Sequence, residues 1–304
     1  MVTCFDIGGS YIRHGQIRAD GSVPEQGRLP TPRESWRDFV AALASCQGND
    51  KSDPIVISLA GAFDDKTGLA DVANIPCLHG RRIASDLGAE LGCPVRIIND
   101  ANAFALAEAV DGVGTGKSVV FGIILGTGVG GGLVTNRTLI TGHGGMAGEW
   151  GHGPVIDPTA GGTISNVPHY RCGCGRTGCV DATCSARGME RLHTSLHGET
   201  ASSKDITDSW HNSERSASRT IDIYTTLLSR SLSMVINLLG PDVVPVSGGL
   251  SSDALLLKEI DRKTRDLALV KYDGPLVMRG TFADNGGLHG AGIIARQAFP
   301  SAPQ

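Results

Sequence analysis

Three cysteines within eight positions are the residues best suited to chemistry, in the run Cys172-Gly173-Cys174-Gly175-Arg176-Thr177-Gly178-Cys179. Thiolates bind zinc with tetrahedral geometry, and the intervening glycines let the chain turn back within a few residues. Four protein ligands make a structural zinc site, whereas three ligands and a water make a catalytic one. The candidates for a fourth ligand are His152 and His169, with Cys184 as a weaker one. The spacing therefore predicts a zinc site.

Two glycine-rich turns are suited to binding phosphate. The first is Asp6-Ile7-Gly8-Gly9-Ser10, and the second is Leu125-Gly126-Thr127-Gly128-Val129-Gly130. Glycines let backbone N–H groups come close to a phosphate, and a carboxylate such as Asp6 can order Mg²⁺ or its water shell. Either turn alone is also what a tight hairpin needs. Two such turns in one chain favour nucleotide binding.

Gly116-Lys117-Ser118 looks like the end of another phosphate-binding motif, the P-loop. The earlier glycine of that motif would fall at Asp111, and a strand rather than a helix is expected to follow. We interpret these residues as a turn.

Two further groups carry acids beside polar partners. In Asn99-Asp100-Ala101-Asn102, the aspartate comes between an expected strand and an expected helix, where a carboxylate can face a cleft or cap the helix. In Glu149-Trp150-Gly151-His152, an acid and an imidazole can hydrogen-bond sugar hydroxyls, which both donate and accept, or form a salt link within a loop.

Apolar patterning places these groups at the ends of strands. Apolar runs predict strands at residues 2–6, 11–17, 55–59, 95–98, 118–125, 133–135 and 243–246. Helical spacing predicts helices at 35–43 with Ser35 as N-cap, and at 81–91, 101–110, 213–239 and 287–298. The glycine-rich segment 126–132 is expected to be a bend, so strand, bend and strand occur twice. We interpret this repeat as two related lobes that close on a nucleotide.

The smaller lobe is expected to comprise residues 1–110 and 288–304, and the larger one 111–287, with the zinc loop at 149–181. The polar stretch 202–219 is expected to be a mobile insertion, which leaves the first turns of the long helix open.

Composition narrows the class of protein. The 304 residues are enough for two lobes with separate cores, and the 42 glycines suit many tight turns. A net charge of -4, from 27 basic and 31 acidic residues, argues against general binding to nucleic acid or anionic lipid. There is no apolar run of membrane-spanning length, and the N-terminal residues do not resemble a signal peptide. We therefore expect a cytoplasmic protein without membrane contact.

These motifs, with Ser247-Gly248-Gly249, resemble the ROK family (repressor, open reading frame, kinase) of sugar kinases and related repressors over almost the full length. The cysteine cluster and the Glu-x-Gly-His element in Gly148-Glu149-Trp150-Gly151-His152 are its most specific parts. The resemblance implies an actin-like ATPase (ribonuclease H-like) fold, with two α/β lobes and the active site in the cleft.

The resemblance also implies a role for each motif. Asp100 would accept the proton of a sugar hydroxyl, usually the one on C6, as that hydroxyl attacks the γ-phosphate of ATP. By the same mapping, His152 completes the zinc site with Cys172, Cys174 and Cys179, and the metal holds the loop that bears Glu149. The sugar-contacting positions map onto Asn74, Asn99, Asp100, Glu149, His152 and Asp181. The nucleotide positions map onto Gly8, Gly9, Ser10, Thr127, Gly128, Gly248 and Gly249.

Two positions depart from the family pattern. Ser10 stands where threonine is usual and keeps the hydroxyl, whereas Asp181 replaces a glutamate and reaches less far by one methylene. The long spacer between His152 and Cys172 is similar to that of bacterial N-acetylglucosamine kinases, which favours N-acetylglucosamine over N-acetylmannosamine or glucose as the sugar. A homodimer is expected from the resemblance.

Two other classes of protein fit less well. A repressor of this family carries a helix-turn-helix domain before the sugar-binding core. The strand expected from Val2 leaves no room for that domain, and the net charge is negative. A sugar-binding module without catalysis is disfavoured because Asp100 and both glycine-rich turns are present.

Overall fold

The computed structural model describes residues 1–304 except 49, 65–66, 73 and 301–304. The chain divides into two compact units. The first comprises Met1–Ala107, Thr138–Ala147 and the described residues of Asn285–Gln304, and the second comprises Glu108–Arg137 and Gly148–Asp284. Each unit is built around its own β-sheet.

The sheet of the first unit has the strand order β3-β2-β1-β4-β7. Strand β1 (Thr3–Ile7) pairs antiparallel with β2 (Tyr11–Gln16), and β2 pairs antiparallel with β3 (Gly27–Pro30). On its other edge β1 is parallel to β4 (Ile55–Leu59), which is parallel to β7 (Val95–Asn99). Parallel pairing brings the carboxyl ends of β1, β4 and β7 to one edge of the sheet.

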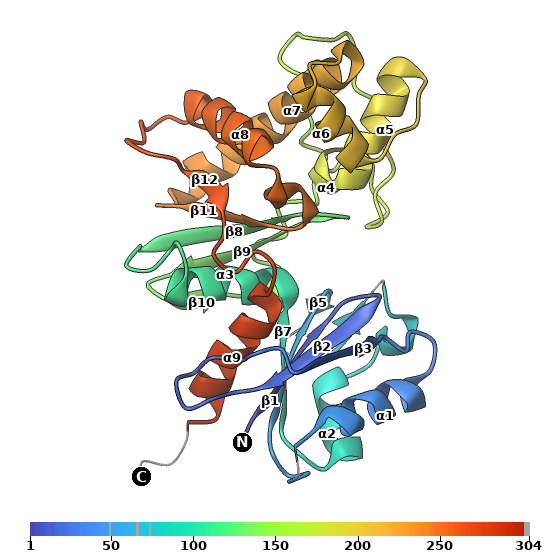
Figure 1. Cartoon of the computed structure of the whole chain (residues 1–304), viewed down its shortest axis with the longest axis vertical. Coiled ribbons are helices and arrows are strands. Elements are labelled where there is room, and N and C mark those ends of the chain that lie inside the picture. Colours follow the sequence, from blue (N-terminus) through green and yellow to red (C-terminus); the bar gives the residue numbers. More distant parts are fainter. Residues whose placement is uncertain (49, 65–66, 73, 301–304) are drawn as a thin grey trace. The chain divides into compact units, whose positions relative to one another are not determined.

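Helices cover both faces of this sheet (Figure 1). Alternate side chains of a strand point to opposite faces. Phe5 and Ile57 accordingly belong to the core with α1 (Trp36–Cys46) and α2 (Ile83–Leu91), whereas Cys4 and Val56 pack with α9 (Gly286–Ala298). Ser35 caps α1 by accepting the N–H of Asp38 at 3.2 Å, as its sequence predicts. The same unit contains β5 (Ala62–Phe63), β6 (Ala70–Asp71), η1 (Pro76–Leu78) and η2 (His143–Gly145).

Small residues let α9 pack very close to its neighbours. A Cβ at Gly290 would lie 2.1 Å from the carbonyl oxygen of Ala103, in α3 (Asp100–Asp111), and one at Gly286 would lie 2.6 Å from the Phe104 ring. Real side chains do not tolerate such distances, so part of the high glycine content serves helix packing rather than turns.

The sheet of the second unit continues from β9 through β8 and β11 to β12. Strand β8 (Val119–Leu125) is antiparallel to β9 (Val129–Thr135) and parallel to β11 (Val244–Ser247), which is parallel to β12 (Val277–Arg279). Strand β10 (Thr138–Ile140) follows β9 through a turn at Asn136 and Arg137, both in the left-handed region.

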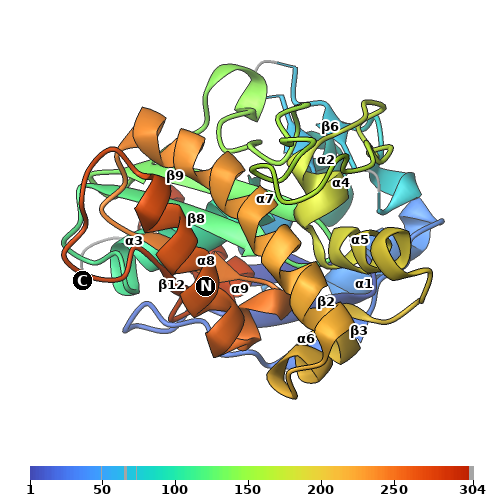
Figure 2. The same ribbon diagram turned by 90° about the horizontal axis from the view of Figure 1, so that it is seen from above.

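The helices of the second unit form its other layer. The long helix α7 (Arg215–Leu239) lies beside α8 (Ala254–Leu267), and both contribute to the core under β8 (Figures 1 and 2). The remaining elements are α4 (Val180–Cys184), α5 (Ala186–His197), α6 (Ser203–His211) and η3 (Gly249–Ser252). Among the residues that the structure describes, no helix is both long and apolar enough to cross a bilayer.

Two local predictions are wrong. The bend expected at 126–132 is shorter, because β9 begins at Val129 and Gly131 pairs with Ile123 of β8. The stretch 202–219 is not a mobile insertion. It forms α6, capped by Ser202, and the start of α7, with Ile206 and Ala217 buried. Its polar residues occupy the outer faces of amphipathic helices, which hid the buried ones.

Candidate functional site

Asp6 lies near the end of β1 against the first turn of α9. A Cβ at Gly287 would lie 2.2 Å from the Asp6 Oδ1 atom, so only glycine fits there. Burial raises the pKa of Asp6, and the charge of Arg13, its cross-strand neighbour, opposes this shift. The N-terminal turn of a helix also favours a nearby negative charge. The carboxylate is thus held in a fixed place at a strand end.

The turn at Gly8, Gly9 and Ser10 is held by a residue that sequence reasoning missed. The Thr31 hydroxyl donates to the Gly8 carbonyl oxygen at 2.7 Å, and the Thr31 N–H donates to the Ser10 carbonyl oxygen at 3.0 Å. The Gly8 N–H itself closes the turn onto Tyr11, at 3.0 Å. Asn74 lies beside this turn, because a Cβ at Gly9 would be 3.4 Å from the Asn74 Cβ atom. The candidate phosphate turn at Gly8–Ser10 and the candidate sugar residue Asn74 are therefore neighbours.

Asn99 and Asp100, at the junction of β7 and α3, make different hydrogen bonds. The Asn99 Oδ1 atom accepts the N–H of Asn102 at 3.0 Å, and its Nδ2 donates to the carbonyl oxygen of Gly61 at 2.9 Å. Asn99 therefore acts as the helix cap that either residue was able to supply. Asp100 is half-buried, and its Oδ1 accepts the N–H of Ala101 at 2.9 Å.

The second glycine-rich turn is tight and lies beside another predicted nucleotide motif. The Gly126 N–H donates to the Gly128 carbonyl oxygen at 3.0 Å, and the Gly126 carbonyl accepts from Ala186 at 2.8 Å. Gly248 has a φ of +89°, and a Cβ there would lie 2.4 Å from the Leu125 carbonyl oxygen. The structure thus brings Gly126 and Gly248 together, with Thr127 exposed and Gly249 directly after.

The segment that bears Glu149 and His152 lies directly on the backbone of β9. A Cβ at Gly148 would be 2.3 Å from the Gly131 carbonyl oxygen, and one at Gly151 would be 2.4 Å from the Val129 carbonyl oxygen. The Trp150 indole donates to the Gly130 carbonyl oxygen at 2.9 Å. A Cβ at Gly131 would lie 2.7 Å from the Trp150 ring and 2.8 Å from the Gly148 carbonyl oxygen, which explains a glycine at this position inside a strand.

Four side chains form a candidate metal centre. The ligand atoms of His152, Cys172, Cys174 and Cys179 all lie within 4.8 Å of one another. The Cys174 and Cys179 sulfurs are 3.7 Å apart, and His152 Nδ1 is 3.5 Å from the Cys172 sulfur. Thiolates bound to one tetrahedral zinc lie about 3.7 Å apart, so the donor set and its spacing fit zinc.

The other two candidates for a fourth ligand lie outside this group of four. His169 packs against Gly178, whose Cβ would be 3.4 Å from its ring, and Cys184 is completely buried in the helical core. Burial raises the pKa of Cys184 strongly, which disfavours the thiolate that a metal needs.

Burial and backbone hydrogen-bond donors shift the pKa values of groups in and around the cluster. Burial raises the pKa of Cys172 to about 12, whereas backbone hydrogen bonding from Arg176 lowers the pKa of Cys174 to about 6. Burial also raises the pKa of Glu149, opposed by His152, whose Nε2 lies 3.7 Å from the Glu149 Oε2 atom. The imidazole therefore points one nitrogen at the thiols and the other at an acid.

Asp181 lies between the cluster and the second glycine-rich turn. Its Oδ1 accepts the N–H of Val129 at 2.8 Å, and its own N–H donates to the Gly151 carbonyl oxygen at 2.9 Å. Its Oδ2 lies 3.5 Å from the Cys172 sulfur. The carboxylate expected to contact sugar thus has a protein neighbour at each oxygen, and these contacts were invisible in the sequence.

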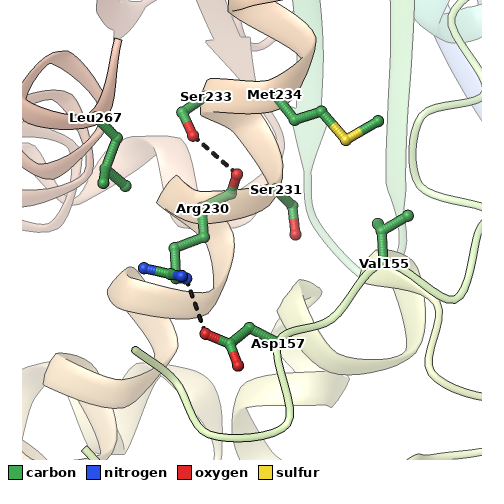
Figure 3. Close-up of a pocket in the computed structure, with 7 residues that line it drawn as sticks. All are labelled: Val155, Asp157, Arg230, Ser231, Ser233, Met234 and Leu267. Carbon is green, nitrogen blue, oxygen red and sulfur yellow. Dashed lines mark hydrogen bonds and ion pairs between the residues drawn. The ribbon is translucent and has the colours of Figure 1, made fainter. Parts of the chain in front are cut away.

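A cavity of about 320 Å³ elsewhere in the second unit contains none of the candidate residues (Figure 3). Within it, Arg230 of α7 forms an ion pair with Asp157 at 2.8 Å. This pair ties the long spacer between His152 and Cys172 to α7. The cavity is lined by Val155, Asp157, Arg230, Ser231, Ser233, Met234 and Leu267.

Comparison with known proteins finds one family over nearly the whole chain. The ROK family model matches residues 2–298. N-acetyl-D-glucosamine kinase of Citrobacter koseri is 35% identical over 298 residues, which cover 95% of this chain and 97% of the relative. The enzyme of the same name from Pasteurella multocida is 32% identical over 303 residues, with the same coverage.

Solved structures agree with this result. A ROK hexokinase from Thermus thermophilus superposes with a TM-score of 0.82 at 25% identity, covering 98% of each chain. A ROK family glucokinase from Streptomyces griseus, in complex with glucose and AMPPNP, gives 0.79 at 26% identity and covers 97% of this chain and 99% of that one. The predicted α/β fold of the actin-like ATPase class is confirmed.

The bridging role of Asn99 makes a testable prediction. Asn99→Ala removes the cap of α3 and the donor to Gly61, and we expect the free energy of unfolding to fall by about 1–2 kcal/mol. Asn99→Asp keeps the cap acceptor and loses the donor, so it should recover part of this loss. Urea titration of the three proteins measures the effect, and an Asn99→Ala protein as stable as wild type would contradict it.

Proposed function

Because the chain belongs to the ROK family, we propose that it transfers the γ-phosphate of ATP to the 6-hydroxyl of N-acetyl-D-glucosamine. The observation that carries the choice of sugar is the similarity to N-acetyl-D-glucosamine kinases at 32–35% identity over 95% of the chain. N-acetylmannosamine and glucose are the alternative sugars. We further propose that the protein is cytoplasmic and, on the family resemblance alone, that it is a homodimer.

In this proposal Asp100 is the catalytic base. Phosphoryl transfer needs a positioned hydroxyl, neutralised phosphate charge and one base within hydrogen-bond reach of that hydroxyl. Asn99 caps α3, so Asp100 is not needed as the cap of that helix. Half-burial at the first turn of α3 supports the role, because the carboxylate stays partly accessible to a substrate hydroxyl.

The nucleotide is proposed to bind through the glycine-rich turns. Backbone N–H groups of the turns at Gly8-Gly9-Ser10 and Gly126-Thr127-Gly128 would hold the phosphates, and Asp6 would order Mg²⁺ or its water shell. Gly248 and Gly249 would complete the nucleotide side. The fixed position of Asp6 and the contact between Gly126 and Gly248 support this assignment.

The sugar is proposed to bind to Asn74, Asn99, Glu149 and His152, with Zn²⁺ held by His152, Cys172, Cys174 and Cys179. Zinc held by these residues would fix the tautomer of His152, and the other ring nitrogen would be able to donate to a hydroxyl or to Glu149. The 3.7 Å separation between His152 Nε2 and Glu149 supports this arrangement.

A coupled assay that follows ADP release tests the substrate. We expect kcat/KM with MgATP to be highest for N-acetylglucosamine, because its acyl group is the feature that the similar kinases are named for. N-acetylmannosamine, glucose and fructose are the comparisons. Preference for glucose would make the protein a glucokinase, and no turnover with any hexose or N-acylhexosamine would reject the kinase proposal.

Asp100→Asn tests the base. The amide keeps the shape and loses the proton acceptor, so we expect kcat to fall about 10²–10⁴-fold while the Kd for the sugar changes less than about threefold. Stopped assays give kcat, and calorimetry gives the sugar Kd. Glu108→Gln is unsuitable as a control, because Glu108 is buried and accepts the N–H groups of Val113 and Phe282. Glu90→Gln, an exposed acid on α2, is a suitable control. Near-normal turnover by Asp100→Asn would reject Asp100 as base.

Elemental analysis tests the metal. We expect one zinc per chain in the wild type and none in Cys174→Ser, because three ligands hold zinc far more weakly than four. Limited proteolysis of that variant should cleave within 149–181. Cys46→Ser removes a half-buried thiol of α1 and should leave zinc content unchanged. A metal-free Cys174→Ser protein with normal activity and protease resistance would show that the cluster is not a structural zinc site.

A further inference from the structure

Asp181 contacts both the candidate metal cluster and the second glycine-rich turn. One carboxylate oxygen accepts the N–H of Val129 at 2.8 Å, and the other lies 3.5 Å from the sulfur of Cys172. We propose that Asp181 is a positioning residue that ties the turn Gly126–Val129 to the zinc-loaded cluster, so that zinc sets the affinity for nucleotide. This rests on the proposed function, in which that turn holds phosphate.

Two segments of the chain connect Asp181 to the cluster, one through His152 and one through Cys179. Gly151, whose carbonyl oxygen accepts the Asp181 N–H at 2.9 Å, directly precedes the ligand His152. The ligand Cys179 stands two residues before Asp181, at the start of α4. A metal that joins His152 to Cys179 therefore fixes both backbone ends of this hydrogen bond. The carboxylate is held in place by the same two segments that hold the metal.

The turn Gly126–Val129 leaves room for the Asp181 carboxylate. A Cβ at Gly128 would lie 2.8 Å from the Asp181 Oδ1 atom, so a side chain there would push the carboxylate away. On the other side, the Gly151 backbone lies against the Val129 carbonyl oxygen, with room for no Cβ. Val129 is buried, so its N–H depends on Asp181 rather than on water. Loss of this acceptor would let the end of the turn move.

Removal of Asp181 has opposite effects under its two possible roles. A residue that binds sugar would, when removed, weaken sugar binding and leave nucleotide binding unchanged. A residue that positions the phosphate turn would do the opposite. The short aspartate side chain, committed to Val129 on one oxygen, favours the second role.

The test measures the Kd of ADP and the Kd of N-acetylglucosamine separately, by calorimetry on zinc-loaded protein. Asp181→Ala removes the acceptor for Val129, Asp181→Asn keeps a carbonyl oxygen at the same reach, and Asp208→Ala removes an exposed acid on α6 as control. Zinc content is measured in every sample, so that loss of metal is not mistaken for loss of the hydrogen bond.

We expect Asp181→Ala to raise the Kd of ADP about tenfold, the effect of leaving one buried N–H without its acceptor. Asp181→Asn and Asp208→Ala should stay within about threefold of wild type, and the sugar Kd should be unchanged in all three. A tenfold loss of sugar binding with normal ADP binding would overturn the inference and return Asp181 to the sugar site. Failure of the wild type itself to bind ADP would instead overturn the proposed function, and this inference with it.

Amide hydrogen exchange on the wild type gives a second test that needs no variant. Removing zinc with a chelator should speed exchange in a peptide that covers 126–129, and should leave a peptide from β2 in the other unit unchanged. Reloading zinc should restore protection. Equal exchange at 126–129 with and without zinc would show that the metal does not hold the turn.

Discussion

The second unit depends on a close contact between two backbones, the segment 148–151 and strand β9. No side chain fits between them, since a Cβ at Gly148 or Gly151 would lie 2.3 or 2.4 Å from a carbonyl oxygen of the strand. This close packing is rigid, because movement of either backbone would break the contact. Glu149 and His152 are part of this segment or directly beside it. Their positions therefore follow from backbone packing more than from the packing of their own side chains.

The same strand unites the parts of the proposed function in this unit. Strand β9 begins at Val129, where the Gly126–Gly128 turn ends, and segment 148–151 lies along it. The cluster brings five acidic groups close together, because its three thiols lie near Glu149 and Asp181. Burial raises the pKa of Cys172 and of Glu149, so their ionised forms are unfavourable without a counter-charge. In the proposed zinc site, a divalent cation would supply that charge and stabilise the thiolates.

Local signals predicted much of this fold, and tertiary contacts explain the rest. The apolar run of β4 and the Ser35 cap of α1 are visible in a few neighbouring residues, and both are confirmed. The sequence predicts a bend at 126–132, whereas Gly131 lies inside β9, where segment 148–151 leaves no room for a Cβ. Thr31 holds the Gly8 turn from 23 positions away, and Asp181 holds Val129 from 52. Such pairings leave no local pattern in the sequence.

The central claim is that a sugar hydroxyl, activated by one carboxylate, attacks the terminal phosphate of ATP. The position of phosphate on the product tests it most directly. Phosphorus–carbon coupling in the nuclear magnetic resonance spectrum of the product made from N-acetylglucosamine should place the phosphate on C6. Phosphate on the anomeric carbon, or release of inorganic phosphate without a sugar ester, would contradict the account.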